Sequence, residues 1–190
     1  MGKSILVSEI ASRQQLRMAF LRWAVVTVPA ILLLGFAAAN SVPVGSVNRW
    51  YAMLIKPAET PPDWLFPVAW TTLYVLMGLA LALVLNARGS AWRGLAIGLF
   101  AAQLVVNLAW TPLFFGAHLL FWSLMVIVLM FVLAAAATYA FARVRRGAAL
   151  LMLPYLGWIL FAGNLNYKIN VLNPNAETLV PTAGSAQIPL

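Results

Sequence analysis

Long apolar runs, separated by short polar or charged segments, dominate this sequence. The 49 residues between Arg93 and Arg143 contain no Lys, Arg, Asp or Glu. Because about 20 apolar residues already cross the hydrocarbon core of a bilayer, this stretch must hold two crossings, joined at the Pro/Gly break of residues 112–116. The same count along the whole chain predicts five transmembrane helices, within residues 23–48, 64–87, 94–117, 119–142 and 147–167.

The composition agrees with a membrane protein. Hydrophobic residues make up 64% of the chain and charged residues 8%, whereas a soluble domain carries about 25% charged residues. None of the runs has the alternation of polar and apolar residues that marks a barrel strand, and helices satisfy their own backbone groups in lipid. We therefore expect an all-α integral membrane protein, a five-helix bundle with the lipid bilayer as a partner.

The charged residues predict an orientation rather than a nucleic-acid partner. The chain has twelve Lys and Arg against four Asp and Glu, and these cations stand singly or in small groups at the ends of apolar runs. Nine fall on the predicted N-terminal side of the membrane and three, Arg49, Lys56 and Lys168, on the other. This excess predicts a multi-pass protein with a cytoplasmic N-terminus, and it favours a bacterial plasma membrane.

The chain divides into three predicted parts. Residues 1–22 form a basic N-terminal extension and a candidate interfacial helix, residues 23–172 form the membrane domain, and the proline-containing residues 173–190 form a disordered tail. The chain has no cysteine, and His118 is its one histidine. We expect no metal site, no catalytic residue and no obligatory cofactor.

The first loop, residues 40–63, is the one sizeable connection between the predicted helices. Three prolines within six residues make it stiff, because proline fixes its φ angle. Its tryptophans and tyrosine are residues that also gather at membrane interfaces, which is the alternative role for them. We predict that the loop covers the bundle as a lid, with functional residues Trp50, Lys56, Pro57, Glu59, Pro61 and Pro62.

Three predicted helices carry polar and aromatic side chains along one face. At about 100° per residue, the three stripes are Phe66, Trp70, Leu73 and Met77 with Tyr74 beside them; Gln103, Asn107, Trp110 and Phe114; and Trp158, Ala162 and Leu165, bordered by Asn166. An amide inside a membrane either joins helices or lines a ligand site. The repeated pairing of a tryptophan with a small or amide residue favours a pocket for a flat, mostly apolar ligand with polar edges.

The third predicted helix has a second face of small residues. Gly94, Gly98 and Ala102 follow the small-xxx-small spacing, which permits two helix backbones to approach closely. They point away from the stripe that contains Asn107. This face therefore packs either on another subunit or inside the same bundle, and the sequence leaves both alternatives open.

The stripes and the first loop together resemble the TspO/MBR family of tryptophan-rich sensory proteins, which includes the translocator proteins. The matching motifs stand in family order: Trp50-Tyr51, Lys56-Pro57, Pro61-Pro62, and the segments 64–74, 103–116 and 154–167. The resemblance implies a five-helix bundle, often a homodimer, with a pocket for porphyrins and drugs beneath the first loop. The pocket residues that it implies are Tyr51, Trp70, Asn107, Trp110, Trp158, Ala162 and Leu165.

The sequence departs from the family pattern at two places. Family members usually carry a tryptophan two residues after the Lys-Pro pair, where this chain has Glu59, so the lid loses an aromatic wall and gains a negative charge. A cholesterol motif needs a spacer between a tyrosine and the next basic residue. Here Lys168 follows Tyr167 directly, and Val171 stands at the family's more distal arginine position. These residues argue against cholesterol as a partner.

The resemblance implies a membrane receptor that senses, sequesters or transports tetrapyrroles such as protoporphyrin IX. In this interpretation Trp70, Trp110 and Trp158 contact the macrocycle, and Asn107 and Tyr51 bond its polar edges. From their charge, and not from a family motif, we expect Lys56 or Arg49 to meet a propionate. One alternative is an enzyme that degrades porphyrins in light or with oxygen, with the pocket tryptophans in radical chemistry. A second is a regulatory membrane protein without ligand chemistry, which acts through the small-residue face or the N-terminal extension.

Overall fold

The computed structural model of the protein describes residues 13–179. Its five long helices are α1 (Arg13–Ala39), α3 (Leu65–Asn86), α4 (Arg93–Thr111), α5 (Leu120–Val144) and α6 (Arg146–Leu172). Each contains a segment that is long and apolar enough to cross a membrane. The short elements are η1 (Gly45–Val47), α2 (Arg49–Met53), η2 (Pro112–Gly116) and η3 (Ala176–Thr178). The described residues include no β-strand, so the predicted all-α fold with five membrane helices is confirmed.

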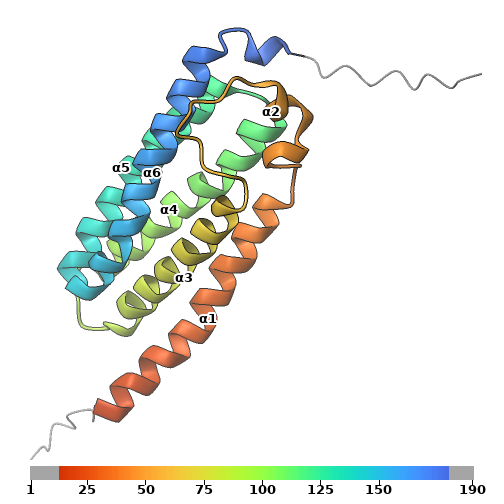
Figure 1. The fold of residues 1–190 in the computed structure, drawn as a ribbon. Coiled ribbons are helices and arrows are strands. Elements are labelled where there is room, and N and C mark those ends of the chain that lie inside the picture. Colours follow the sequence, from red (N-terminus) through yellow and green to blue (C-terminus); the bar gives the residue numbers. More distant parts are fainter. Residues whose placement is uncertain (1–12, 180–190) are drawn as a thin grey trace, which may run out of the picture.

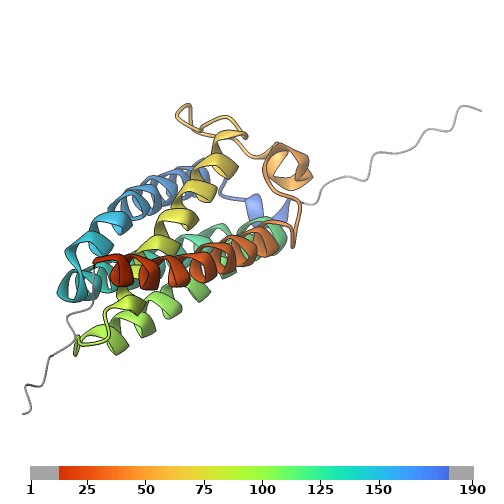
Figure 2. The same cartoon turned by 90° about the horizontal axis from the view of Figure 1, so that it is seen from below.

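The long helices pack around the bundle in the order α1, α3, α6, α5 and α4 (Figure 1). Figures 1 and 2 show α1 along the outside of the bundle, against α3. The first loop and the C-terminal end of α6 lie at one end of the bundle. The start of α1 and the α3–α4 and α5–α6 connections, with most of the basic residues, lie at the other end. The direction in which this axis crosses a membrane stays a prediction.

The first helix begins earlier than the predicted membrane domain. α1 starts at Arg13, so residues 13–22, which the sequence analysis assigned to an N-terminal extension, continue without a break into the first membrane helix. The hydropathy of the sequence indicates where the membrane-embedded part of the helix begins. Arg17 and Arg22 precede that point, but both favour helix formation, so the helix starts earlier. Residues 1–12 lie outside the described part of the chain.

Residues 173–179, predicted as part of a disordered tail, instead form a turn and the short helix η3. The Asn173 side chain donates to the Ile55 carbonyl and accepts from the Ile55 N–H, both at 2.8 Å. The indole N–H of Trp50 donates to the Ala176 carbonyl at 2.8 Å. These bonds fasten the segment to the first loop, a long-range contact that composition cannot reveal. Residues 180–190 lie outside the described part of the chain.

Helix α4 ends in a π-turn at the predicted Pro/Gly break. Pro112 has no N–H and cannot bond to the carbonyl of residue 108. The Ala117 N–H bonds to the Pro112 carbonyl at 2.9 Å, five residues earlier, and wide turns of this kind often occur at functional sites. Asn48 of the first loop donates to the Phe115 carbonyl at 3.0 Å, a group that the wider turn leaves available. The turn and the first loop are thereby joined.

The small-residue face of α4 lies on the outside of the bundle. A Cβ atom added at Gly94 or Gly98 would meet no atom within 4 Å, and both glycines and Ala102 are exposed. Within the described chain, this face therefore does not pack inside its own bundle. Of the two alternatives that the sequence left open, only contact with another molecule, a lipid or a second protein, remains.

Candidate ligand pocket

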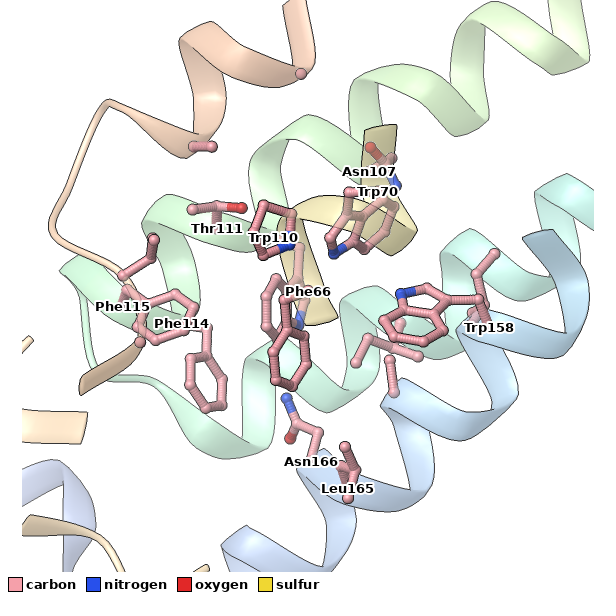
Figure 3. A pocket seen from close by; sticks show the side chains of 18 of the residues that line it. Phe66, Trp70, Asn107, Trp110, Thr111, Phe114, Phe115, Trp158, Leu165 and Asn166 are labelled. Atoms are coloured by element: carbon pink, nitrogen blue, oxygen red, sulfur yellow. The ribbon is translucent and has the colours of Figure 1, made fainter. Parts of the chain in front are cut away.

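A cavity of about 320 Å³ lies between the first loop and the helices, with walls from α1, α3, α4 with η2, α5 and α6. Figure 3 shows aromatic side chains that converge on it from different helices. The structure brings to this one cavity all seven residues that the sequence analysis assigned to a ligand pocket, namely Tyr51, Trp70, Asn107, Trp110, Trp158, Ala162 and Leu165. Their role in binding stays a prediction.

Nine of the 25 residues that line the cavity are aromatic. The ring centroids of Trp70 and Trp158 lie 6.4 Å apart with an edge-to-face angle of 83°, and Phe66 meets Trp158 at 6.1 Å and 74°. On the opposite side Trp110 stacks on Phe114 at 4.9 Å and 21°. Edge-to-face and offset packing hold such rings in place. The result is a fixed wall of flat apolar surfaces.

Asn107 holds three helices together at the base of the cavity. Its Oδ1 accepts the Tyr74 hydroxyl of α3 at 3.0 Å, and its Nδ2 donates to the Tyr155 hydroxyl of α6 at 3.1 Å. The Tyr155 hydroxyl in turn donates to Oε1 of Gln103 at 2.8 Å. Tyr155 and Gln103 are fully buried and do not line the cavity. The amide stripe of α4 thus joins helices, and Asn107 also lines the pocket.

Two other polar groups at the cavity have no partner among the described residues. The indole Nε1 of Trp110 and both polar atoms of the Asn166 side chain are buried without a hydrogen bond. Asn166 is 2% exposed and lines the cavity from α6. Figure 3 shows its amide pointing from α6 into the cavity. These atoms are buried polar groups that the cavity offers to a ligand, in addition to the hydroxyl and carboxylate groups of Tyr51, Thr111 and Asp63 in its lining.

Only part of the first loop faces the cavity. Tyr51, Thr60 and Asp63 line it. Trp50 does not line the cavity; it is 1% exposed, and its ring stacks on that of His118 with centroids 4.4 Å apart. It therefore holds the lid in place and does not face a ligand. Among the other predicted lid residues, Pro57 is buried, Lys56 and Pro61 are half-buried, and Glu59 and Pro62 are exposed.

Two carboxylates fasten the first loop at the mouth of the cavity. Glu59 forms an ion pair with Lys168 of α6, and the hydrogen bond from Lys168 holds the pKa of Glu59 below its ordinary value. Asp63 accepts the Ser46 N–H at 2.8 Å, and this bond likewise lowers the pKa of Asp63. Both carboxylates are therefore ionised at neutral pH. The Glu59 ion pair links the loop to α6, and the Asp63 bond joins two parts of the loop to each other.

Comparison with known proteins decides the family. The sequence profile of the TspO/MBR family matches residues 24–172, which is most of the chain. The chain belongs to the TspO/MBR family. The resemblance found in the sequence motifs is therefore confirmed, and this TspO/MBR protein is an integral, multi-pass membrane protein. Membership supports a role as a membrane receptor or sensor.

Relatives from bacteria and a mammal cover most of the chain. The tryptophan-rich protein TspO of Chlorobaculum tepidum is 43% identical over 147 residues, 75% of this chain and 90% of that protein. The tryptophan-rich sensory protein of Cereibacter sphaeroides is 41% identical over 149 residues, 76% of this chain and 92% of that protein. The translocator protein of Bos taurus is 42% identical over 127 residues, 66% of this chain and 75% of that protein.

Several residues that line the cavity are not among the predicted pocket residues. Phe66, Tyr74, Phe114 and Asn166 all line the cavity. Each stands on or beside one of the three stripes, so helical periodicity alone could have included them. Phe115, Gly35 and Ala39 also line it, but no pattern pointed to them, because their position depends on the π-turn and on the packing of α1.

In this TspO/MBR protein we expect the Glu59–Lys168 ion pair to hold the first loop on α6. Glu59→Gln should raise the hydrogen-exchange rates of the loop amides a few-fold and leave those of the helices unchanged, since an exposed ion pair contributes little. The charge swap Glu59→Lys with Lys168→Glu should restore the protection. Hydrogen-exchange mass spectrometry on peptides from residues 54–64 would measure the effect.

The same ion pair predicts a pH dependence. Because the pKa of Glu59 is lowered in the folded protein, its contribution is complete above the unfolded-chain value of about 4.3. It is lost as the pH falls through the lower folded value. After correction for intrinsic exchange, acidification below about pH 4 should loosen the wild-type loop more than that of Glu59→Gln, in which Asp63 is the remaining carboxylate that fastens the loop. Glu177→Gln, which removes a carboxylate outside this contact, is the control. A Glu59→Gln loop as protected as wild type at pH 7 would contradict the prediction.

Proposed function

We propose that this protein binds tetrapyrroles such as protoporphyrin IX in the cavity, as a membrane receptor that senses, sequesters or transports them. The observation that carries the proposal is the convergence of Trp70, Trp110 and Trp158 on one apolar cavity. Indole rings present large flat surfaces with a single polar group, which suits a flat macrocycle with few polar atoms. Membership of the TspO/MBR family supports the same class of function.

The mouth of the cavity suits the charged edge of such a ligand. A volume of about 320 Å³ is near the lower limit of small-molecule sites, so a macrocycle would fill the cavity with one edge and leave the other at the mouth. Lys56 does not line the cavity, but its Nζ lies 4.5 Å from the ring centroid of Tyr51, which does. A propionate at this edge would pair with Lys56 without losing all of its water, which avoids the cost of burying a charge.

Protoporphyrin IX titrated in the dark into the full chain in nanodiscs tests the proposal. We expect saturable binding, seen as a shift of the porphyrin absorbance band, and an affinity reduced about tenfold or more in Trp158→Ala, as for aromatic anchors that become buried on binding. The matched control is Trp122→Ala, which removes an indole that is 59% exposed on the outside of α5. It should bind like wild type.

Two results would overturn the tetrapyrrole proposal. The first is a folded wild-type protein, with an unchanged circular dichroism spectrum, that gives no saturable binding. The second is an equal loss of affinity in Trp158→Ala and Trp122→Ala, which would move the porphyrin from the cavity to the lipid-facing surface. Thermal unfolding of each variant separates loss of a contact from loss of the fold.

We also propose that the small-residue face of α4 forms a homodimer. The face is exposed and has the spacing that lets two helices approach closely. Since the chain contains no cysteine, a single Ala102→Cys variant reports on this face alone. Mild oxidation in nanodiscs should give a disulfide-linked dimer. Val132→Cys, 58% exposed on α5, should not, and equal cross-linking of both would contradict the proposed interface.

A further inference from the structure

The cavity contains one amide that the fold itself does not use. Both polar atoms of the Asn166 side chain lack a partner among the described residues, although the residue is 2% exposed. Burying an amide without hydrogen bonds is costly, and more so where the surroundings are lipid and apolar side chains. A molecule in the cavity that forms hydrogen bonds with this amide would remove that cost.

Asn107, the other amide of the cavity, already forms its hydrogen bonds with other side chains of the protein. Its Oδ1 accepts from Tyr74, and its Nδ2 donates to Tyr155 and to the sulfur of Met130. An amide nitrogen has two hydrogens to donate, so both donors of Asn107 are used. Among the described residues, the free donors and acceptor of Asn166 and the free N–H of Trp110 are therefore the buried polar groups of the cavity that are left for recognition.

The kind of ligand group follows from what these atoms can pair with. The Asn166 amide both donates and accepts, whereas the indole of Trp110 only donates. A ligand ester, ether or carboxylate offers acceptors alone and would leave Asn166 Oδ1 unpaired. Among the described residues that line the cavity there is no Lys, Arg or His, so a carboxylate would also be buried without a counter-charge.

We propose that Asn166 selects ligands that present a neutral group with a donor beside an acceptor, such as a lactam or an unsubstituted carboxamide on a flat apolar frame. The two amides pair edge to edge, and Trp110 Nε1 donates to an acceptor of the ligand. The inference rests on the proposed function in that the cavity is a ligand site, and it adds the polar group that is recognised there.

A matched pair of probes tests the inference. Phenanthridin-6(5H)-one is a flat lactam, and its N-methyl derivative has the same frame and carbonyl without the donor. Titrated into the full chain in nanodiscs and followed by tryptophan quenching, the lactam should bind wild type about tenfold more tightly than the N-methyl compound, the effect of leaving one buried amide unpaired. In Asn166→Leu the two affinities should be equal.

The variants are expected to fold, so the comparison is interpretable. Asn166→Leu replaces an amide without partners by an apolar side chain of similar size, which leaves stability unchanged or raises it. Asn107→Leu is the control within the same cavity, because it removes an amide whose groups are already bonded. It should weaken both probes alike and retain the preference for the lactam.

The outcomes separate the inference from the proposed function. Equal affinities of wild type for the two probes, or a lactam preference that persists in Asn166→Leu, would overturn the role of Asn166. If phenanthrene and protoporphyrin IX still bind in that case, the cavity remains a ligand site with a different polar contact. Absence of saturable binding by both probes, phenanthrene and protoporphyrin IX would overturn the ligand site and the inference together.

Discussion

Replacing Gly78 with leucine is expected to separate α1 from α3 and to destabilise the bundle by about 3 kcal/mol or more, at the upper end of overpacking effects. A Cβ atom at this position would lie 2.7 Å from the Cα of Val28 and 2.8 Å from its Cγ2. Because the first of these atoms belongs to the backbone, a change of rotamer cannot relieve the clash. The two helices would have to move apart.

The separation would also break a hydrogen bond. The hydroxyl of Thr27 donates to the Gly78 carbonyl at 2.8 Å, and Thr27 is buried between the helices. Since α1 contributes Gly35, Phe36 and Ala39 to the cavity, its displacement would remove one wall of the pocket. We therefore expect Gly78→Leu to weaken porphyrin binding as well as stability.

Thermal unfolding in nanodiscs, followed by circular dichroism, would measure the loss. Gly157→Leu is the matched control, because it places the same side chain in a membrane helix at an exposed position where a Cβ atom meets nothing within 4 Å. Its unfolding temperature should stay close to that of wild type. A Gly78→Leu protein as stable as Gly157→Leu would show that α1 is not held by this close approach.

The sequence was sufficient to predict the helices because each one is an uninterrupted apolar run. Residues 94–142 had to contain two crossings by length alone, and the break occurs where Pro112 removes a backbone hydrogen bond. The helix ends were less predictable. Arg13 begins α1 although the apolar run starts later, since lipid contact and helix formation depend on different properties of a residue.

Helical periodicity also predicted that the tryptophans face one pocket. It could not predict which of the two amides forms hydrogen bonds with the protein. Asn107 is bonded because Tyr74 and Tyr155 approach it from two other helices. Among residues 13–179, Asn166 has no such neighbour. Whether a polar group finds hydrogen-bond partners depends on helix rotation and on contacts between distant segments. Trp50 shows the same limit, since its burial depends on His118 and on the segment after α6.

The hydrogen bonds of Asn107 make a second strong prediction. Asn107→Leu should lower the free energy of unfolding by about 1–3 kcal/mol, because two hydrogen bonds between membrane helices are lost at about 0.6–1.7 kcal/mol each. The Tyr74 hydroxyl would then be buried without its partner, and Tyr155 would keep only Gln103. Freed from α4, the Tyr74 ring would no longer be fixed as a wall of the cavity.

Asn166→Leu provides the decisive comparison, because it makes the same change in an amide of the same cavity that has no partner among the described residues. Removing an unpaired buried amide relieves a desolvation cost, so this variant should unfold at or above the wild-type temperature while Asn107→Leu unfolds below it. The opposite signs distinguish an amide that joins helices from one that is free to bind a ligand. If both variants lost stability to the same degree, Asn166 would have a structural partner, and its assignment to recognition would have to be abandoned.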